Sequence, residues 1–260
     1  MKWLGLIATA FTGILLLSAT PYFPSFGDPN SPANAGVNGG VSVSQYYITE
    51  TYTDTKVPNI VTAVLADYRG YDTMFETVVI FAAGVAIFAI LRSFGGTTIP
   101  SHPTAIDTSV EGDHQRIIIG MTCKLIIPVI QLFALYVVAH GHHSPGGGFQ
   151  GGVILGASFI LMALAKELDT ALARFSEKRY LALACVGIFI YSGFGLLCVA
   201  LERNFLDYGI LHRLMPATDE IMARSHSMLG VEVGVAFTVT AIMFAIYANL
   251  SSKGRLEQGF

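Results

Sequence analysis

A glycine-rich segment with three histidines interrupts the apolar sequence in the second half of the chain. It runs from His140 to Gly152, reads HGHHSPGGGFQGG, and separates two apolar stretches that are each long enough to cross a bilayer. Glycine permits sharp turns and proline removes a backbone donor, so the segment cannot continue a regular helix. At membrane depth, such backbone is found where it is buried in protein or lines a wet cavity. We therefore expect a broken helix start near residues 140–152, with free amides or carbonyls facing a cavity, as in discontinuous transporter helices. The residues of this helix-break motif are His142, His143, Pro145, Gly146, Gly147, Gly148, Gly151 and Gly152.

The histidines of this segment favour proton transfer over metal binding. His142 and His143 are adjacent, would point apart in a regular element, and have no carboxylate or cysteine close by in the sequence. Histidine titrates near neutral pH, so His140 at the membrane boundary is a candidate for a proton relay or a pH sensor. We expect no metal site beyond transient Na⁺ binding.

Four charged residues cluster in the first third of the chain, namely Asp67, Arg69, Asp72 and Glu76. Asp72 and Glu76 are four residues apart, so they share a face if a helix begins near Asp72. Two carboxylates on one face can hold one proton between them or a cation between their oxygens, which is the chemistry of proton–sodium exchange. The alternative is a solvated helix N-terminus whose acids complement the helix dipole, and it suits Asp72 better than Glu76.

Two further charges, Lys124 and Glu232, lie inside apolar stretches. A charge at a helix centre costs about 2.5–3.5 kcal/mol on insertion scales, so each needs a physical reason. The topology given below places Lys124 nearer the inner face and Glu232 nearer the outer face, so we do not expect them to pair directly. Each is a candidate for lining a polar path or meeting another subunit. A structural ion pair within the bundle, or snorkelling to the membrane surface, is the alternative.

The composition is that of an integral membrane protein, because 53% of the residues are hydrophobic and only 13% are charged, whereas soluble domains carry about 25% charge. A net charge of −3 provides no basic surface for nucleic acid. The distribution of Lys and Arg predicts that both termini are cytoplasmic. We expect an all-α integral membrane protein with about six transmembrane helices, since six segments approach the roughly 20 apolar residues that a span requires. These segments are 3–20, 73–92, 117–139, 150–166, 180–201 and 226–249.

The first segment also resembles a secretory signal, but we expect it to be retained as a helix. Residues 21–58 are rich in Pro, Gly, Asn and Ser, and they predict a loop on the outer side with a short strand near residues 41–48.

A second polar stretch, residues 95–115, contains Gly95, Gly96 and two prolines and predicts a cytoplasmic linker. It divides the chain into a two-helix piece, residues 1–94, and a four-helix piece, residues 116–260.

Both pieces resemble known families. Residues 141–152, GHHSPGGGFQGG, are similar to the GHNxPGGGFxGG signature of the B subunit of Mrp-type multisubunit cation/proton antiporters, the MnhB family, with His143 in place of Asn. Residues 230–235, GVEVGV, resemble the DIGV segment of the same family, with Glu232 in place of Asp. This resemblance covers roughly residues 112–250.

The front piece has a resemblance of its own. Residues 57–76, VPNIVTAVLADYRGYDTMFE, are similar to the pattern VNxILVDFRGxDTxGE. That pattern occurs in a small E-type subunit of membrane-bound hydrogenases, and also at the C-terminal end of the large Mrp A subunit. The residues at its polar positions are Asp67, Arg69, Asp72 and Glu76, and Phe75 replaces a small residue.

The two resemblances together imply a fusion of neighbouring parts of such complexes. They imply a non-enzymatic subunit of a Na⁺/H⁺ antiporter in the cell's inner (plasma) membrane, which lines part of the cation path beside A-, C- and D-like subunits and membrane lipids. Two alternatives stay open: a purely structural scaffold subunit, and a sodium-translocating module of a redox-linked, hydrogenase-like complex. The chain has no ligand set for a redox centre, and we expect no cofactor.

Overall fold

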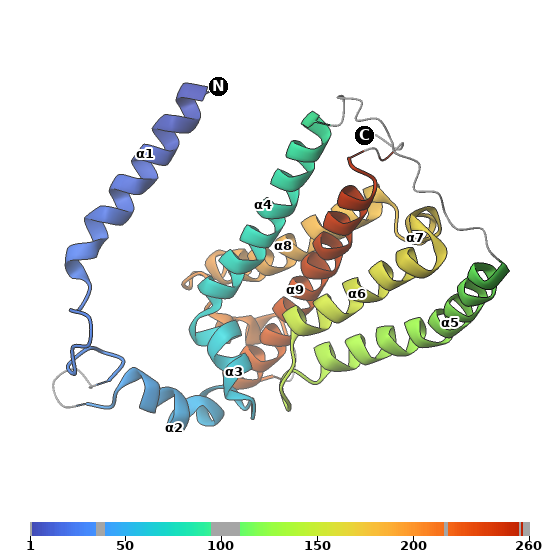
Figure 1. The fold of residues 1–260 in the computed structure, drawn as a ribbon. Coiled ribbons are helices and arrows are strands. Elements are labelled where there is room, and N and C mark those ends of the chain that lie inside the picture. The colour runs from blue at the N-terminus through green and yellow to red at the C-terminus, as the bar shows by residue number, and fades with distance from the viewer. Residues whose placement is uncertain (1, 35–39, 95–109, 216–217, 255, 257–260) are drawn as a thin grey trace. The chain divides into compact units, whose positions relative to one another are not determined.

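The computed structural model describes residues 2–34, 40–94, 110–215, 218–254 and 256, and within these ranges every regular element is helical (Figure 1). Six helices in the described part of the chain are long and apolar enough to cross a membrane. This confirms the predicted all-α membrane fold and the number of spans. The six candidate spans are Trp3–Tyr22, Gly70–Ser93, Ile117–Ala139, Gly148–Lys166, Glu177–Ala200 and Glu220–Ser251.

The chain divides into two compact units, residues 1–50 and 51–260. The first unit contains α1 (Lys2–Ala19), whose described side chains are almost all exposed. An apolar helix that buries so little of itself within its own unit presents a surface suited to lipid or to another membrane protein.

The short strand predicted near residues 41–48 is wrong, because α2 (Val43–Thr55) occupies this part of the loop predicted over residues 21–58. The tyrosines and β-branched residues of the segment favour a strand by propensity. A strand needs a partner for its backbone groups, however, and no strand lies in the described ranges to provide one. A helix satisfies its own backbone, and the hydroxyl of Thr49 adds a hydrogen bond of 3.1 Å to the carbonyl of Gln45.

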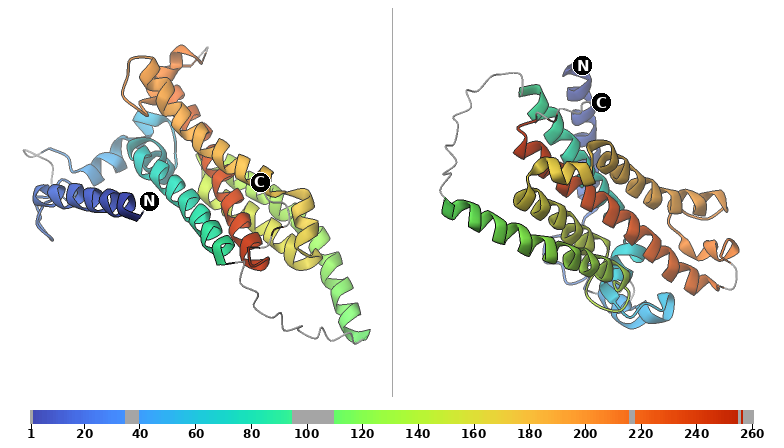
Figure 2. Two further views of the ribbon diagram at one scale, coloured as in Figure 1. Left: turned by 90° about the horizontal axis from the view of Figure 1, so that it is seen from above. Right: turned by 90° about the vertical axis from the view of Figure 1, so that its right-hand side faces the viewer.

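The second unit is built around α9 (Glu220–Ser251), which is the most buried of the candidate spans. Helices α4, α6 and α8 pack directly against it, and α6 lies between α9 and α5 (Figures 1 and 2). Residues 95–109 of the predicted linker lie outside the described residues, and α5 begins at Val110. The helices around α9 are α4 (Gly70–Phe94), α5 (Val110–Ala139), α6 (Gly148–Lys166) and α8 (Glu177–Ala200), while the short elements α7 (Leu168–Arg174) and η4 (Tyr208–Arg213) precede and follow α8.

Glycines and threonines set the position of α9 between α6 and α8. A Cβ atom on Gly152 of α6 would lie 2.9 Å from the carbonyl oxygen of Ala236, and one on Gly187 of α8 would lie 2.2 Å from the hydroxyl of Thr238. The hydroxyl of Thr240 donates a 3.0 Å hydrogen bond to the carbonyl of Gly152. Small residues allow such close approach of membrane helices, and cross-helix hydroxyl bonds then fix their rotation.

Before α4, the chain forms the short helix α3 (Ile60–Ala63) and a five-residue π-helical turn, η3 (Val64–Tyr68). Asn59 caps α3 by accepting a hydrogen bond from the amide of Val61. Asp67 of this segment contacts Arg224 of α9, and Asn59 contacts the loop between α5 and α6.

Candidate functional site

The helix break is where the sequence predicts it, since α5 ends at Ala139 and α6 begins at Gly148. Gly147 has φ +132°, a backbone conformation that L side chains rarely adopt. A Cβ atom on Gly148 would lie only 1.9 Å from the carbonyl oxygen of Glu232, so no larger residue fits there without a shift of the backbone. These glycines let the first turn of α6 approach α9 at Glu232.

The carboxylate of Glu232 accepts a hydrogen bond from the backbone N–H of Gly148, at the first residue of α6. Glu232 is only 8% exposed. The N-terminus of a helix offers unpaired amides and a partial positive charge, both of which stabilise an anion. The break in the helix therefore provides a donor for a carboxylate that lies inside a membrane span.

A cavity of about 230 Å³ lies beside this carboxylate. The residues with polar side chains in its lining come from four helices: Thr62 of α3, Thr73, Glu76 and Thr77 of α4, Gln150 of α6, and Glu232 of α9. A water molecule occupies about 30 Å³ of liquid, so the cavity has room for several. Oxygen ligands and carboxylates suit a hard cation such as Na⁺, and the described residues contain no His/Cys/Asp/Glu cluster that could hold a resident metal ion.

Asp72 and Glu76, which the sequence predicts to share a helix face, have different surroundings in the structure. Asp72 and Glu76 both lie on α4, but Asp72 is in its first turn and forms a partly exposed ion pair with Arg69. Glu76 instead shares the cavity with Glu232. The carboxylates that face a common space thus come from two different helices, and the helix-terminus interpretation fits Asp72.

Asp67 forms a buried ion pair with Arg224 of α9, in which the Nε of Arg224 donates a 2.7 Å hydrogen bond to Oδ2. The Asp67 side chain is 7% exposed and that of Arg224 is 26% exposed. Burial raises the pKa of Asp67, and the guanidinium of Arg224 offsets part of that rise. Arg224 was not among the predicted site residues because the sixth span was expected to begin at residue 226. Its spacing of eight from Glu232, two helical turns, is the signal that could have identified it.

His142 is the buried histidine of the motif. Its Nε2 lies 2.8 Å from the carbonyl oxygen of Ser225 on α9. Burial lowers the pKa of His142. His140, the predicted relay candidate, is exposed and stacks on Tyr136 with 4.0 Å between ring centroids. His143 is also exposed.

The carbonyls of the break are held by the front segment. The Nδ2 of Asn59 donates to the carbonyls of Gly141 and Ser144, at 2.8 and 2.9 Å, and its backbone N–H donates to that of His142 at 3.0 Å. The hydroxyl of Thr62 donates to Gly141 at 2.7 Å. These carbonyls bind protein donors, whereas the amide of Gly148 donates to Glu232 at the cavity, which Gly146 of the break also lines. Sequence reasoning did not single out Asn59 or Thr62.

Lys124 is exposed on α5 and forms no salt bridge with any described residue, Glu232 included. The structure therefore does not bring Lys124 to the cavity that contains Glu76 and Glu232.

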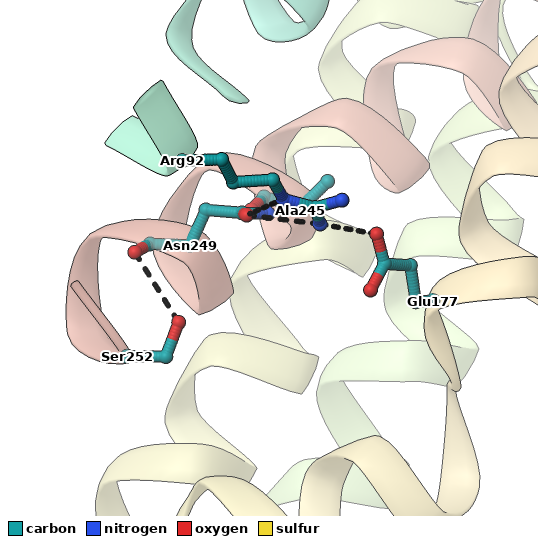
Figure 3. Close-up of polar contacts among 5 residues, drawn as sticks. All are labelled: Arg92, Glu177, Ala245, Asn249 and Ser252. Carbon is teal, nitrogen blue, oxygen red and sulfur yellow. Dashed lines mark hydrogen bonds and ion pairs between the residues drawn. The ribbon is translucent and has the colours of Figure 1, made fainter. Parts of the chain in front are cut away.

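A second charged cluster lies at the other end of the bundle (Figure 3). Arg92 of α4 pairs with Glu177 of α8, and its Nε and Nη2 lie 3.4 and 3.3 Å from Oδ1 of Asn249 on α9. Glu177 and Asn249 are buried. The cluster joins three helices roughly 25 Å along α9 from Glu232, at 1.5 Å per residue. From the sequence, Arg92 indicated only the orientation of its span.

Comparison with known proteins identifies two family matches. Residues 118–245 match a domain related to the MnhB subunit of Na⁺/H⁺ antiporters, and residues 37–103 match MbhE, the E subunit of MBH.

Individual relatives are similar over about half of the chain. The A/B subunit of a probable K⁺/H⁺ antiporter from Rhizobium meliloti is 24% identical over 138 residues, which are 48% of this chain and 14% of that protein. An uncharacterised protein of Methanocaldococcus jannaschii is 30% identical over 166 residues, 57% of this chain and 62% of that protein. A putative antiporter subunit mnhB2 of Staphylococcus aureus is 26% identical over 135 residues, 52% of this chain and 94% of that protein. The chain thus spans less than two thirds of the first two of these relatives.

Two solved structures share the fold. One is the Mrp complex from Dietzia sp. DQ12-45-1b, with a TM-score of 0.66, 23% identity, and coverage of 99% of this chain and 27% of that chain. The other is the membrane-bound sulfane sulfur reductase, an archaeal respiratory membrane complex, with a TM-score of 0.54, 22% identity, and coverage of 91% and 97%. In this multi-pass membrane protein, residues 118–245 are thus similar to an MnhB-related domain, and residues 37–103, which precede them, are similar to MbhE.

Proposed function

We propose that this chain is a membrane subunit of a multisubunit monovalent cation (Na⁺)/proton antiporter, and that the cavity between Glu76 and Glu232 is part of its cation path. The proposal rests above all on one observation, the buried carboxylate of Glu232 at the N-terminus of a broken helix. The description of the MnhB-related family and the names of the Rhizobium and Staphylococcus relatives support antiport as the activity of the whole complex.

The cavity brings together carboxylates from two helices, Glu76 of α4 and Glu232 of α9, and could therefore couple two ions. Carboxylates that line one space can hold a cation between their oxygens or exchange it for a proton, which is the chemistry that antiport requires. Thr62, Thr77 and Gln150 add neutral oxygens for a cation that loses part of its water shell. Moving one charge across 100 mV is worth about 2.3 kcal/mol, which is enough to drive such an exchange.

The same proposal includes the setting of the chain. It places the protein in the inner (plasma) membrane with both termini in the cytoplasm, beside A-, C- and D-like subunits and lipid, and without an enzymatic role of its own. It also treats residues 1–94 and 116–260 as two functional pieces joined by the linker 95–115. The hydrogen bonds from Asn59 and Thr62 to the helix break support joint action of the two pieces.

The experiment is Na⁺-dependent proton exchange in everted vesicles that contain the whole complex. We expect Glu232→Gln to lower the exchange rate at least tenfold while the complex still assembles on native gels. Glu220→Gln, which removes an exposed carboxylate from the first turn of the same helix, should leave the rate within twofold of wild type. Normal exchange in an assembled Glu232→Gln complex would refute the proposal and favour a scaffold role.

A second candidate is a sodium-translocating module of a redox-linked complex. The match to the MbhE family and the 97% coverage of a chain from a respiratory membrane complex favour it. The two candidates differ in their energy source. Exchange driven by an imposed ion gradient alone supports the antiporter, whereas cation movement that requires an added electron donor supports the redox-linked module.

A further inference from the structure

Helix α5 presents one face to the rest of its unit and leaves the other uncovered. Ile127 and Ala134 are buried against the bundle, at 4% and 0% exposure. On the outer side, Met121, Leu125 and Leu132 are 69–75% exposed. In Figure 2 the helix lies at the edge of the second unit, beyond α6. This apolar outer face is suited to a membrane environment, but it also carries Lys124.

Lys124 lies too deep in its span to reach the membrane surface readily. The span begins at Ile117, so Lys124 is about 10 Å from that end at 1.5 Å per residue. A four-carbon side chain covers only part of that distance. Lys124 makes no hydrogen bond or ion pair with a described residue. Facing lipid, this side chain would have no counter-ion in hydrocarbon, where an ionisable group is costly.

Pro128 interrupts the backbone hydrogen bonding of α5 one turn after Lys124. Proline has no backbone N–H, so it cannot donate to the carbonyl of Lys124, four residues earlier in the helix. Lys124 and Pro128 are both exposed and, being four residues apart, share one face. One turn of this face thus combines an ionisable side chain with a missing i to i+4 backbone hydrogen bond at membrane depth, where unpaired backbone is costly.

We propose that the outer face of α5 docks a transmembrane helix of another membrane subunit, and that an Asp or Glu on that helix pairs with Lys124. The counter-ion is assigned to a protein because lipid phosphates lie at the interface, not at this depth. The apolar residues around Lys124 would form the rest of the contact. This inference rests on the proposed function, because it requires the chain to be one subunit of a membrane complex.

The test is zero-length crosslinking of the intact complex in its own membrane. Dicyclohexylcarbodiimide, which enters bilayers, activates a buried carboxyl group. The amine of a neighbouring lysine then displaces it to form an amide, and dicyclohexylurea leaves. Mass spectrometry of the digested product should identify an amide between Lys124 and an Asp or Glu in a transmembrane helix of a second subunit.

Two variants serve as controls. Lys124→Arg keeps the positive charge but not the reactive amine, so the complex should assemble and the crosslink should be absent. Lys124→Glu opposes like charges, and we expect it to lower the amount of this chain in the assembled complex at least fivefold on native gels. Three outcomes would overturn the docking proposal while leaving the proposed function intact. In the assembled wild-type complex, Lys124 could form an amide with this same chain or form no amide at all. Alternatively, Lys124→Glu could assemble normally. A wild-type chain that migrates alone would overturn both.

Discussion

At the scale of single residues, the site depends on how each charge inside the bundle is compensated. Glu232 binds an amide of the helix break, Asp67 binds Arg224, and Arg92 binds Glu177. By contrast, the pair formed by Arg69 and Asp72 lies at the surface. Buried and exposed pairs respond differently to the loss of one partner, which gives a direct test of these assignments.

We expect Asp67→Asn to destabilise the protein markedly, because it leaves the guanidinium of Arg224 without its counter-ion. Breaking a fully buried pair costs about 3–5 kcal/mol, and the effect here should be smaller because 26% of the Arg224 side chain is exposed. Asp72→Asn breaks the exposed pair and should cost about 0–1 kcal/mol. Thermal denaturation of the purified complex compares the two variants. Equal Tm values would contradict the assignment, and a restored Tm in Asp67→Asn combined with Arg224→Met would support it.

The buried position of His142 against α9 should lose stability in acid, because burial disfavours the charged ring more than the hydrogen bond to Ser225 favours it. Burial lowers the pKa of His142 below its ordinary value of about 6.5. The neutral ring therefore contributes stability that is present above pH 6.5 and is lost as the pH falls through the lower folded pKa. The ionisable groups that face His142 are His143 in the same loop and His226 on α9, and both lower the pKa of His142.

Hydrogen exchange of the backbone amides of residues 57–63 and 140–148 measures this effect. Protection should fall between pH 7 and pH 5 in wild type and in His140→Gln, which changes an exposed ring of the same segment. In His142→Gln, whose side chain does not titrate, protection should be nearly independent of pH. An identical pH dependence in His142→Gln would show that another group is responsible.

At the scale of helices, the glycines that shape the break also determine how close α6 comes to α9. Replacing Gly148 by alanine should push the two helices apart, since the added Cβ would lie 1.9 Å from a backbone oxygen of Glu232. Overpacking typically costs 1–3 kcal/mol, and a clash with backbone should reach about the upper end of that range or exceed it. Gly120→Ala, on α5 with nothing within 4 Å of the new methyl group, should be neutral or slightly stabilising. The measurement is the yield of folded protein and its Tm, and a Gly148→Ala variant as stable as Gly120→Ala would contradict this packing.

Much of this element structure could be predicted from the sequence, because a membrane span and a Pro/Gly break are local signals. The six spans and a helix start within residues 140–152 follow from hydropathy and from the glycines, and α6 begins inside that range, at Gly148. The strand near residues 41–48 was wrong because propensity says nothing about whether a pairing strand exists. The partners of the charges, such as Arg224 and Asn249, were missed because they depend on which helix faces meet in the folded bundle. Periodicity along one helix does not reveal its neighbour.

At the scale of the whole second unit, the polar groups lie at two levels of a largely apolar bundle. The cavity with Glu76 and Glu232 lies toward one end of α4 and α9, and the cluster of Arg92, Glu177 and Asn249 lies toward the other (Figure 3). The second cluster joins α4, α8 and α9 through an ion pair and hydrogen bonds. We propose that the first level handles ions, and we regard the second as a connection that holds the helices at their other end.

The central claim is that Glu76 and Glu232 act on the same ion, because they line one cavity. The most direct test compares Na⁺-dependent proton exchange in everted vesicles for wild type, Glu76→Gln, Glu232→Gln and the double variant, all with the complex shown to be assembled. We predict that each single variant loses exchange at least tenfold and that the double variant is no worse than the more damaged single one, because residues that act as a unit are non-additive. Losses that multiply in the double variant, or a single variant with normal exchange, would contradict a shared site.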